Sequence, residues 1–348
     1  MLPRLITFCY PTSVTTRIDL FMKRIAIIGA GLSGMVVAQR LGGVADVCVF
    51  EKSRGVGGRM ATRYAGEYEF DHGTQFFTAR TAAFREFLRP LEERDVIADW
   101  PAKFAELDRD RLADLRSWGA GYPHFVGVPR MNDVGKYLSR ELDIVPGTEI
   151  VEVSRDSNGW TLVDRARNVF DGFDWLVLTS PAPQTASLAA DFPELVALCE
   201  ERDMLGCFAL MLGFRQPVEL PWQAAIVRNS DISWVSVNSS KPGRKAPCTL
   251  LVHSTNAWAD AHMDGEPDRV REHMLSETST VCGLDAREAE HCQVHRWRYA
   301  NIRRQSGPGC YVDDESQLAA CGDWFVRGKV EAAYTSADEL AGQLLELM

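Results

Sequence analysis

A glycine-rich segment near the start of the chain has the spacing of a dinucleotide-binding turn. Gly29, Gly31 and Gly34 form a G-x-G-x-x-G pattern between an apolar segment, 24–28, and a helical pattern, 32–41. The first glycine permits a tight turn, the second lets backbone approach a pyrophosphate, and the third lets helix and strand pack closely. Glu51 follows Gly29 by 22 residues, near the spacing of a carboxylate that binds a ribose hydroxyl. The pattern predicts a site for NAD or FAD.

Two further motifs favour FAD. The segment 55–60, with the sequence GVGGRM, follows Glu51 closely and can wrap backbone and a guanidinium around the same pyrophosphate. A plain dehydrogenase needs no such element. Near the C-terminus, Asp323 follows a short predicted strand, and a helix begins near Val330. Asp323 can accept hydrogen bonds from ribityl hydroxyls, and the positive end of that helix can face the pyrimidine edge of a flavin.

The elements that position these motifs follow from hydrophobic periodicity. Strands at 24–28 and 47–51 flank a helix at 32–41, which is a β-α-β unit. After Arg80 the pattern is helical and charged as far as Asp114, and a glycine- and proline-rich loop follows. Further strands and a closing amphipathic helix are predicted at 149–153, 160–163, 175–179, 206–214, 232–238, 249–255, 318–321 and from about 330.

Together these patterns predict an α/β fold in which a Rossmann-type FAD-binding domain is interleaved with an α+β substrate domain carrying an antiparallel sheet. We assign 22–80, 140–185 and 300–348 to the FAD-binding domain, and 81–139 and 186–299 to the substrate domain. Residues 1–21 are expected to be a non-native or disordered extension, because Met22 directly precedes the first strong strand. A short targeting leader is the alternative for this segment.

Composition narrows the classes of partner. A hydrophobic fraction of 46% predicts a globular protein with a sizeable core, and a net charge of −10 argues against a nucleic-acid partner. The nine cysteines include no C-x-x-C pair, so neither a disulfide framework nor a metal site is expected. Charged residues and prolines interrupt the apolar residues of 1–21, which argues against a membrane anchor. We therefore expect a cytoplasmic protein.

At this point the residues amount to a family resemblance. The segments IAIIGAGLSG, FEKSRGVGGRMATR and FDHGTQFFTAR, all between Arg24 and Arg80, resemble the renalase family, a branch of the amine-oxidase-like flavoproteins. The likeness extends to TSPAPQ at 179–184, NSSKPGR at 238–244, LVHSTNAW at 251–258, HRWRYA at 295–300, and the C-terminal CGDW and GKVEAA. It therefore covers nearly the whole chain beyond residue 22.

The resemblance implies a cofactor, a pocket and an activity. It implies noncovalent FAD held by Gly29, Gly31, Leu32, Gly34, Glu51, Lys52, Arg59, Gln75, Phe76, Asp323 and Val330. It implies a substrate pocket lined by Phe76, Thr78, Arg80, Trp100, His253, Trp297 and Trp324. The implied activity is oxidation of 2- or 6-dihydro isomers of NADH or NADPH, with hydride passing to flavin N5 and then to dioxygen, which gives hydrogen peroxide. No catalytic acid or base is assigned, because a dihydropyridine that becomes aromatic needs positioning more than a base.

Two other functions stay open. Amine and polyamine oxidases commonly place a lysine near the flavin through a water, but the only lysines in 186–300 are Lys241 and Lys245, in a loop with proline and glycine. This disfavours an amine substrate without excluding it. The second alternative is a flavin-binding protein without enzymatic activity.

Several single residues have competing interpretations. Cys310 lies in SGPGCY, which resembles a flavin-tethering motif, but only ten residues separate it from Cys321, so covalent attachment is disfavoured. His253 fits either a core histidine or a pocket residue, and each tryptophan also fits a plain core position. His72 stands where some relatives have an apolar residue. Residues 303–314 do not match the renalase-like pattern, so the resemblance assigns them no role.

Overall fold

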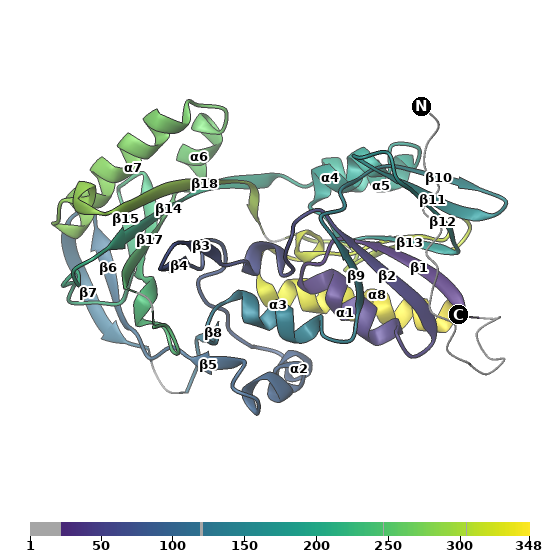
Figure 1. Cartoon of the computed structure of the whole chain (residues 1–348), viewed down its shortest axis with the longest axis horizontal. Helices are drawn as coiled ribbons and strands as arrows, with labels where there is room; N and C mark the ends of the chain where they lie inside the picture. The colour runs from purple at the N-terminus through teal and green to yellow at the C-terminus, as the bar shows by residue number, and fades with distance from the viewer. Residues whose placement is uncertain (1–21, 119–120, 246, 304) are drawn as a thin grey trace. The chain divides into compact units, whose positions relative to one another are not determined.

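The computed structural model describes residues 22–118, 121–245, 247–303 and 305–348 (Figure 1). The extension expected at 1–21 lies outside this range. The chain forms two compact units, each assembled from separate segments. The first contains the described residues up to Gly58, Gly135–Asp203 and 303–348, and the second contains Arg59–Val134 and Met204–Ile302.

The first unit is built on a six-stranded sheet in the order β19-β20-β13-β1-β2-β9, parallel except at β19. β13 and the part of β1 from Ile25 to Ile28 are apolar and buried because both faces of a central parallel strand are covered. β10, β11 and β12 form a separate antiparallel sheet. The elements of this unit are β1 (Lys23–Ile28), α1 (Leu32–Leu41), β2 (Ala45–Glu51), β9 (Asp143–Pro146), β10 (Ile150–Asp156), β11 (Gly159–Asp164), β12 (Val169–Phe173), β13 (Trp175–Leu178), α4 (Ala182–Leu188), α5 (Pro193–Glu200), β19 (Tyr311–Asp313), β20 (Leu318–Ala320) and α8 (Val330–Leu347).

The second unit is built on a seven-stranded sheet in the order β18-β14-β17-β16-β15-β6-β7, antiparallel except between β15 and β6. Two smaller antiparallel pairs, β3–β4 and β5–β8, accompany it. The elements are β3 (Arg63–Ala65), β4 (Tyr68–Phe70), α2 (Ala82–Glu92), β5 (Ile97–Asp99), β6 (Lys103–Asp108), β7 (Arg111–Ser117), β8 (Phe125–Gly127), β14 (Met204–Phe214), β15 (Ala224–Arg228), β16 (Ile232–Val237), β17 (Cys248–Ser254), α6 (Asn256–His262), α7 (Pro267–Cys282) and β18 (His291–Ile302). Of α3 (Asn132–Leu138), residues 132–134 are assigned to the second unit and residues 135–138 to the first.

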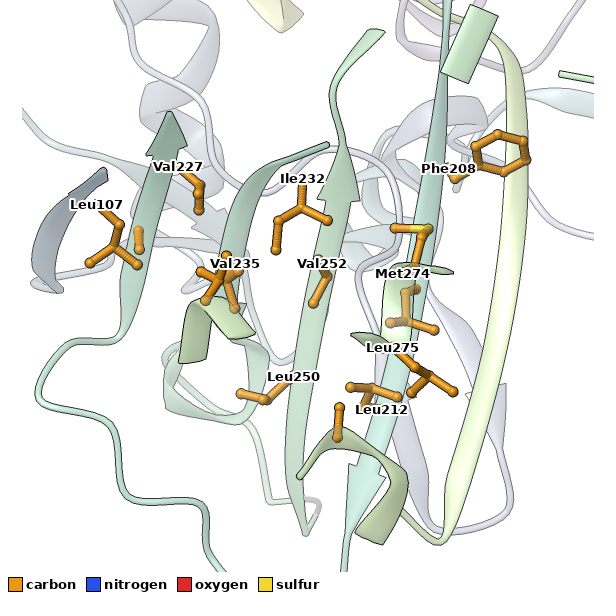
Figure 2. Close-up of a cluster of buried hydrophobic side chains, with 14 of the residues drawn as sticks. Leu107, Phe208, Leu212, Val227, Ile232, Val235, Leu250, Val252, Met274 and Leu275 are labelled. Atoms are coloured by element: carbon orange, nitrogen blue, oxygen red, sulfur yellow. The ribbon is translucent and has the colours of Figure 1, made fainter. Parts of the chain in front are cut away.

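Strand β14 shows why this sheet has a continuous apolar core. Its alternate residues point to opposite faces. Leu210 and Leu212 join a cluster with Met274 and Leu275 of α7. Figure 2 shows Leu212 and the two α7 side chains beside Leu250 and Val252 of the neighbouring strand β17. Met211 points to the other face, where it belongs to a cluster with Tyr68 and Phe70 of β4. Because both faces are covered, β14 is apolar almost throughout.

The predicted α/β fold class, the β-α-β unit and the antiparallel sheet are confirmed. The helical pattern predicted after Arg80 is wrong beyond Glu92, where α2 ends and three strands follow. β7 was hidden because all its residues are exposed, which removes the alternation that marks a half-buried strand. β18 was also missed, since most of its residues are only partly buried and many are polar.

The two units also divide the chain differently from the assignment by sequence. Residues 59–80 belong to the second unit, because Tyr68 and Phe70 pack against β14 and β17. Residues 186–203 belong to the first unit, where α4 and α5 contact each other and α4 contacts β10. No helix in the described part of the chain is long and apolar enough to cross a membrane.

Candidate functional site

The glycine-rich turn joins β1 to α1 at the carboxyl end of the parallel strands. Gly29 has φ +111°, which favours glycine, and its N–H donates to the carbonyl oxygen of Phe50 at 2.8 Å. A Cβ on Gly34 would lie 2.0 Å from the carbonyl oxygen of Gly29, so helix and turn meet there without room for a side chain. A Cβ on Gly31 would meet no atom within 4 Å. The turn is therefore tightly packed on one side and open beside Gly31.

The open side lies at the N-terminus of α1. Gly31 is the N-cap residue, no side chain caps this end, and the first turn contains no acidic residue. The first N–H groups of the helix and its positive dipole end thus suit an anion such as a pyrophosphate. Gly57 donates its N–H to the carbonyl oxygen of Ala30 at 2.8 Å, so the glycine loop after Glu51 folds back onto the turn.

Glu51 connects the turn to the end of β2. It is 6% exposed, and its two carboxylate oxygens accept the N–H groups of Ala30 at 2.8 Å and Ser53 at 2.7 Å. A carboxylate has about four acceptor positions, so ribose hydroxyls can still bind beside these two donors. Glu51 therefore fits the ribose role and also stabilises the loop that carries Gly31.

The N-terminus of α8 lies next to that of α1. The Ser33 hydroxyl donates to the carbonyl oxygen of Ala333 at 2.9 Å, which joins the first turns of the two helices. The N-cap residue Lys329 makes no side-chain cap, and Glu331 in the first turn is buried and already places a carboxylate near this positive end. Asp323 is buried at the start of a short 3-10 helix, 323–325. The first unit therefore places Val330, the first residue of α8, near the glycine-rich turn.

The second unit organises its predicted site residues around the segment 71–76. Asp71 is fully buried and forms ion pairs with Lys241, at 3.2 Å, and with Arg244. Its other carboxylate oxygen accepts the Thr62 hydroxyl at 2.8 Å and the Met131 N–H at 3.0 Å. Two buried cations thus share one carboxylate. Burial alone would raise the pKa of Asp71, but the Lys241 ammonium and the Arg244 guanidinium outweigh burial and hold that pKa well below its usual range.

The Lys241 side chain is buried although its loop contains proline and glycine. Its Nζ donates to Asn238 Oδ1 at 2.9 Å and to Gln75 Oε1 at 3.4 Å, in addition to Asp71. Nζ also lies 5.5 Å from the centre of the Trp100 ring. Burial lowers the pKa of Lys241, and Asp71 opposes that shift. Lys241 is therefore engaged by protein groups, which sequence reasoning did not foresee.

The same network fixes Gln75. Its amide nitrogen donates to the carbonyl oxygens of Asp71 at 2.5 Å and Gly73 at 3.0 Å, and its oxygen accepts the Ser236 hydroxyl at 2.9 Å. Phe76 follows, half-buried, with its ring centre 4.9 Å from Trp118, 5.0 Å from His124 and 5.6 Å from Trp234. These three aromatic residues were not among the predicted pocket residues.

The carbonyl oxygen of His72 joins two predicted pocket residues. His253 Nε2 lies 3.1 Å from this oxygen and Trp297 Nε1 lies 2.9 Å from it. Gly73 allows this contact, because a Cβ there would lie 2.1 Å from the Arg59 carbonyl oxygen and 3.3 Å from Trp297. The His72 ring packs 4.7 Å from His295 and 5.0 Å from Trp297.

The remaining predicted residues are placed as follows. Trp100 and Trp324 are each 1% exposed, and the Trp324 indole N–H donates to the Ser180 carbonyl oxygen at 3.0 Å. The Tyr122 hydroxyl accepts from Arg80 Nε at 3.0 Å and donates to the Thr78 hydroxyl at 3.3 Å. Arg59 donates to the Ala300 carbonyl oxygen at 3.1 Å. Within the described residues, no group of histidine, cysteine or acidic side chains is arranged to hold a metal ion.

Three histidines near this segment are held neutral. Burial, with neighbouring positive groups, lowers the pKa of His72 to about 3 and of His295 to about 4. Burial lowers the pKa of His253 to about 4. All three side chains therefore remain uncharged at neutral pH.

These shifts predict acid sensitivity. Each histidine binds a proton more readily in the unfolded chain, so stability is complete above the unfolded pKa of about 6.5 and is lost as pH falls toward the folded values. We expect a loss on the order of 2 kcal/mol per histidine in the free energy of unfolding between pH 6.5 and 4.5. The three histidines together then account for about 6 kcal/mol, and His72→Leu should remove about one third of that total in urea unfolding measured across the same pH range. An unchanged pH slope in His72→Leu would contradict the assignment.

Comparisons with known proteins agree with the fold and the turn. Residues 27–91 match the model of the NAD(P)-binding Rossmann-like domain, and residues 120–344 match that of flavin containing amine oxidoreductase. The chain is 21% identical to renalase of Mus musculus over 91% of this chain and 97% of the relative.

Solved structures extend the comparison to the fold alone. A putative protoporphyrinogen oxidase from Exiguobacterium sp. 255-15 is similar with a TM-score of 0.74 and 14% identity, over 93% of this chain and 99% of that one. An engineered putrescine oxidase is similar with a TM-score of 0.70 and 11% identity, over 94% and 99%. The two proteins therefore share a fold with this chain despite little sequence identity.

Proposed function

Because the chain belongs to the flavin containing amine oxidoreductase family, we propose that it is an FAD-dependent oxidase of 2- and 6-dihydro isomers of NADH or NADPH. The observation that carries this choice of substrate is the similarity to renalase along 91% of the chain. Bound FAD supplies a hydride acceptor at N5 that dioxygen restores, with hydrogen peroxide as the product.

In this proposal the first unit binds the cofactor at the glycine-rich turn. The open space beside Gly31 and the uncapped N-terminus of α1 receive the pyrophosphate, and Glu51 binds the ribose. Asp323 and the N-terminus of α8 belong to the flavin end. By resemblance, the other proposed cofactor contacts are Leu32, Gly34, Lys52, Arg59, Gln75 and Phe76.

The residues proposed to form the substrate pocket are Phe76, Thr78, Arg80, Trp100, His253, Trp297 and Trp324. Trp100 and Trp324 are nearly fully buried, so their role is to support other side chains from behind. His253 and Trp297 are held by one carbonyl oxygen, which fixes their orientation. Loss of hydride makes the dihydropyridine aromatic, so the protein has to position the ring rather than remove a proton.

An amine substrate is the second candidate, since the family is named for amine oxidation and Lys241 is a buried lysine. However, Asp71, Asn238 and Gln75 all accept hydrogen bonds from the Lys241 ammonium. A lysine held by three protein acceptors is poorly suited to activate a water molecule. This arrangement supports the dihydropyridine substrate over the amine.

A product assay in air tests the proposed function. Air-equilibrated protein should convert a borohydride-generated mixture of NADH isomers to NAD⁺ with one hydrogen peroxide formed per isomer consumed. Only the 2- and 6-dihydro isomers should disappear, while 4-dihydro NADH should persist. Peroxide formation from putrescine or a simple primary amine, with none from the isomers, would contradict the proposal.

Flavin should be released without breaking a covalent bond. Burial and neighbouring Glu339 raise the pKa of the Cys310 thiol to about 12, so it is a poor nucleophile. Heat-denatured, centrifuged protein should therefore leave all flavin in the supernatant as FAD, as measured by chromatography. Flavin that stays with the precipitate of the wild type, but not with that of Cys310→Ala, would show a covalent link.

A further inference from the structure

The hydrogen bond between His253 and His72 fixes the chemistry of the His253 ring. A carbonyl oxygen can only accept, so the Nε2 atom 3.1 Å from the His72 oxygen must carry the proton. The charged groups near this region include Lys241, which disfavours a second proton on His253, Asp71, which pairs with Lys241, and Arg63, whose guanidinium approaches His295 at 3.5 Å. The ring is therefore neutral, with the lone pair on Nδ1.

Nδ1 of His253 has a different surrounding from the corresponding atom of His72. In the part of the chain that is described, His72 Nδ1 is sealed from solvent without a partner, whereas His253 Nδ1 is not among the sealed atoms. Among the described residues, the hydrogen bond at Nε2 is the only one made by the His253 ring, and the residue is partly exposed. His253 thus presents an oriented acceptor to an incoming molecule.

Orientation comes from two directions. Trp297 on β18 and His253 on β17 bind the same carbonyl oxygen, and β14 lies between these strands in the sheet. The His72 carbonyl is itself held between the Asp71 ion pairs and the Arg59–Thr74 backbone hydrogen bond of 2.8 Å. The ring of His253 is consequently held by a backbone carbonyl oxygen rather than by a flexible side chain.

We propose that Nδ1 of His253 accepts a hydrogen bond from the carboxamide N–H of the dihydronicotinamide and so selects substrates by that group. The inference rests on the proposed function. In a dihydronicotinamide dinucleotide the ring nitrogen carries the sugar, so the carboxamide is the N–H donor of the reacting ring. A neutral, oriented acceptor discriminates against an analogue that lacks the donor, because the acceptor then loses its partner.

Three matched substrates test this assignment in anaerobic flavin reduction. They are the 2- and 6-dihydro isomers made from NAD⁺, from its thionicotinamide analogue, which keeps the N–H, and from its 3-acetylpyridine analogue, which lacks it. For each protein, the quantity compared is the rate of flavin reduction by the acetyl isomers divided by the rate with the carboxamide isomers. This ratio should be about tenfold lower in the wild type than in His253→Leu. His253→Gln, whose amide can donate to the His72 oxygen and still accept, should restore the wild-type ratio, and the thio analogue should follow the carboxamide.

The ratio separates this role from a structural one, because a general loss of folding lowers all three rates equally. His262→Leu, at the end of α6, is the control and should keep the wild-type ratio. Equal ratios in wild type and His253→Leu would overturn the inference. If His253→Leu fails to bind flavin, the wild type alone provides the test. The inference is then overturned if the acetyl analogue reduces wild-type flavin as fast as the carboxamide does. Failure of every isomer to reduce wild-type flavin would instead refute the proposed function itself.

Discussion

Gly31→Ala is expected to weaken flavin binding about tenfold to a hundredfold while leaving the fold intact. A Cβ on Gly31 meets no protein atom within 4 Å, so the folded protein tolerates the methyl group. The proposed pyrophosphate occupies that space, and forcing a methyl group into a filled site typically costs about 1–3 kcal/mol. Titration of the apoprotein with FAD, followed by flavin fluorescence, measures the loss.

Gly43→Ala is the matched control. Its Cβ also meets no protein atom within 4 Å, but Gly43 follows α1 at the opposite end from the turn. Both variants should unfold within about 1 kcal/mol of wild type, since a glycine-to-alanine change at an open site has a small effect. Equal FAD affinity in the two variants would place the cofactor elsewhere.

Asp71→Asn is expected to lower the free energy of unfolding by about 3–5 kcal/mol. The substitution removes the only carboxylate that the described structure pairs with Lys241 and Arg244, and it leaves two buried cations uncompensated. Asp71→Asn/Lys241→Met should recover part of the loss, because one of these cations is then gone. Urea unfolding of the single and double variants measures both effects.

Asp264→Asn provides the control, since Asp264 pairs with Arg298 on the surface. Exposed ion pairs contribute little because water screens them. The control should therefore behave like wild type. A loss in Asp71→Asn no larger than that in Asp264→Asn would show that the buried network does not stabilise the segment 71–76.

The turn was predictable from sequence because its requirements are local. One β-α-β unit contains Gly29, Gly31, Gly34 and Glu51. Each glycine is needed for a close backbone approach or a backbone conformation that the sequence pattern itself implies. The boundaries of α1 were predicted for the same reason. When the residues of a motif are close in sequence, their relative positions can be predicted from the sequence.

The second unit was less predictable because its contacts join distant parts of the chain. Asp71 and Lys241 are 170 positions apart, and Pro242 and Gly243 make the lysine look like a loop residue. Likewise, Trp118 directly follows β7 and packs against Phe76, and the exposed β7 carries no strand pattern. A buried charge pair of this kind leaves no periodic signal in either segment.

Anaerobic reduction of the bound flavin tests the central claim most directly. Stopped-flow absorbance should show that 2- or 6-dihydro isomers of NADH or NADPH bleach the flavin within seconds, with 4-dihydro NADH and simple amines far slower. A displacement of about 1 Å in the reacting carbon can change the rate roughly a hundredfold, which is how one site separates isomers. Faster reduction by a primary amine or polyamine than by every dihydropyridine isomer would contradict the proposed function and assign the protein to amine oxidation.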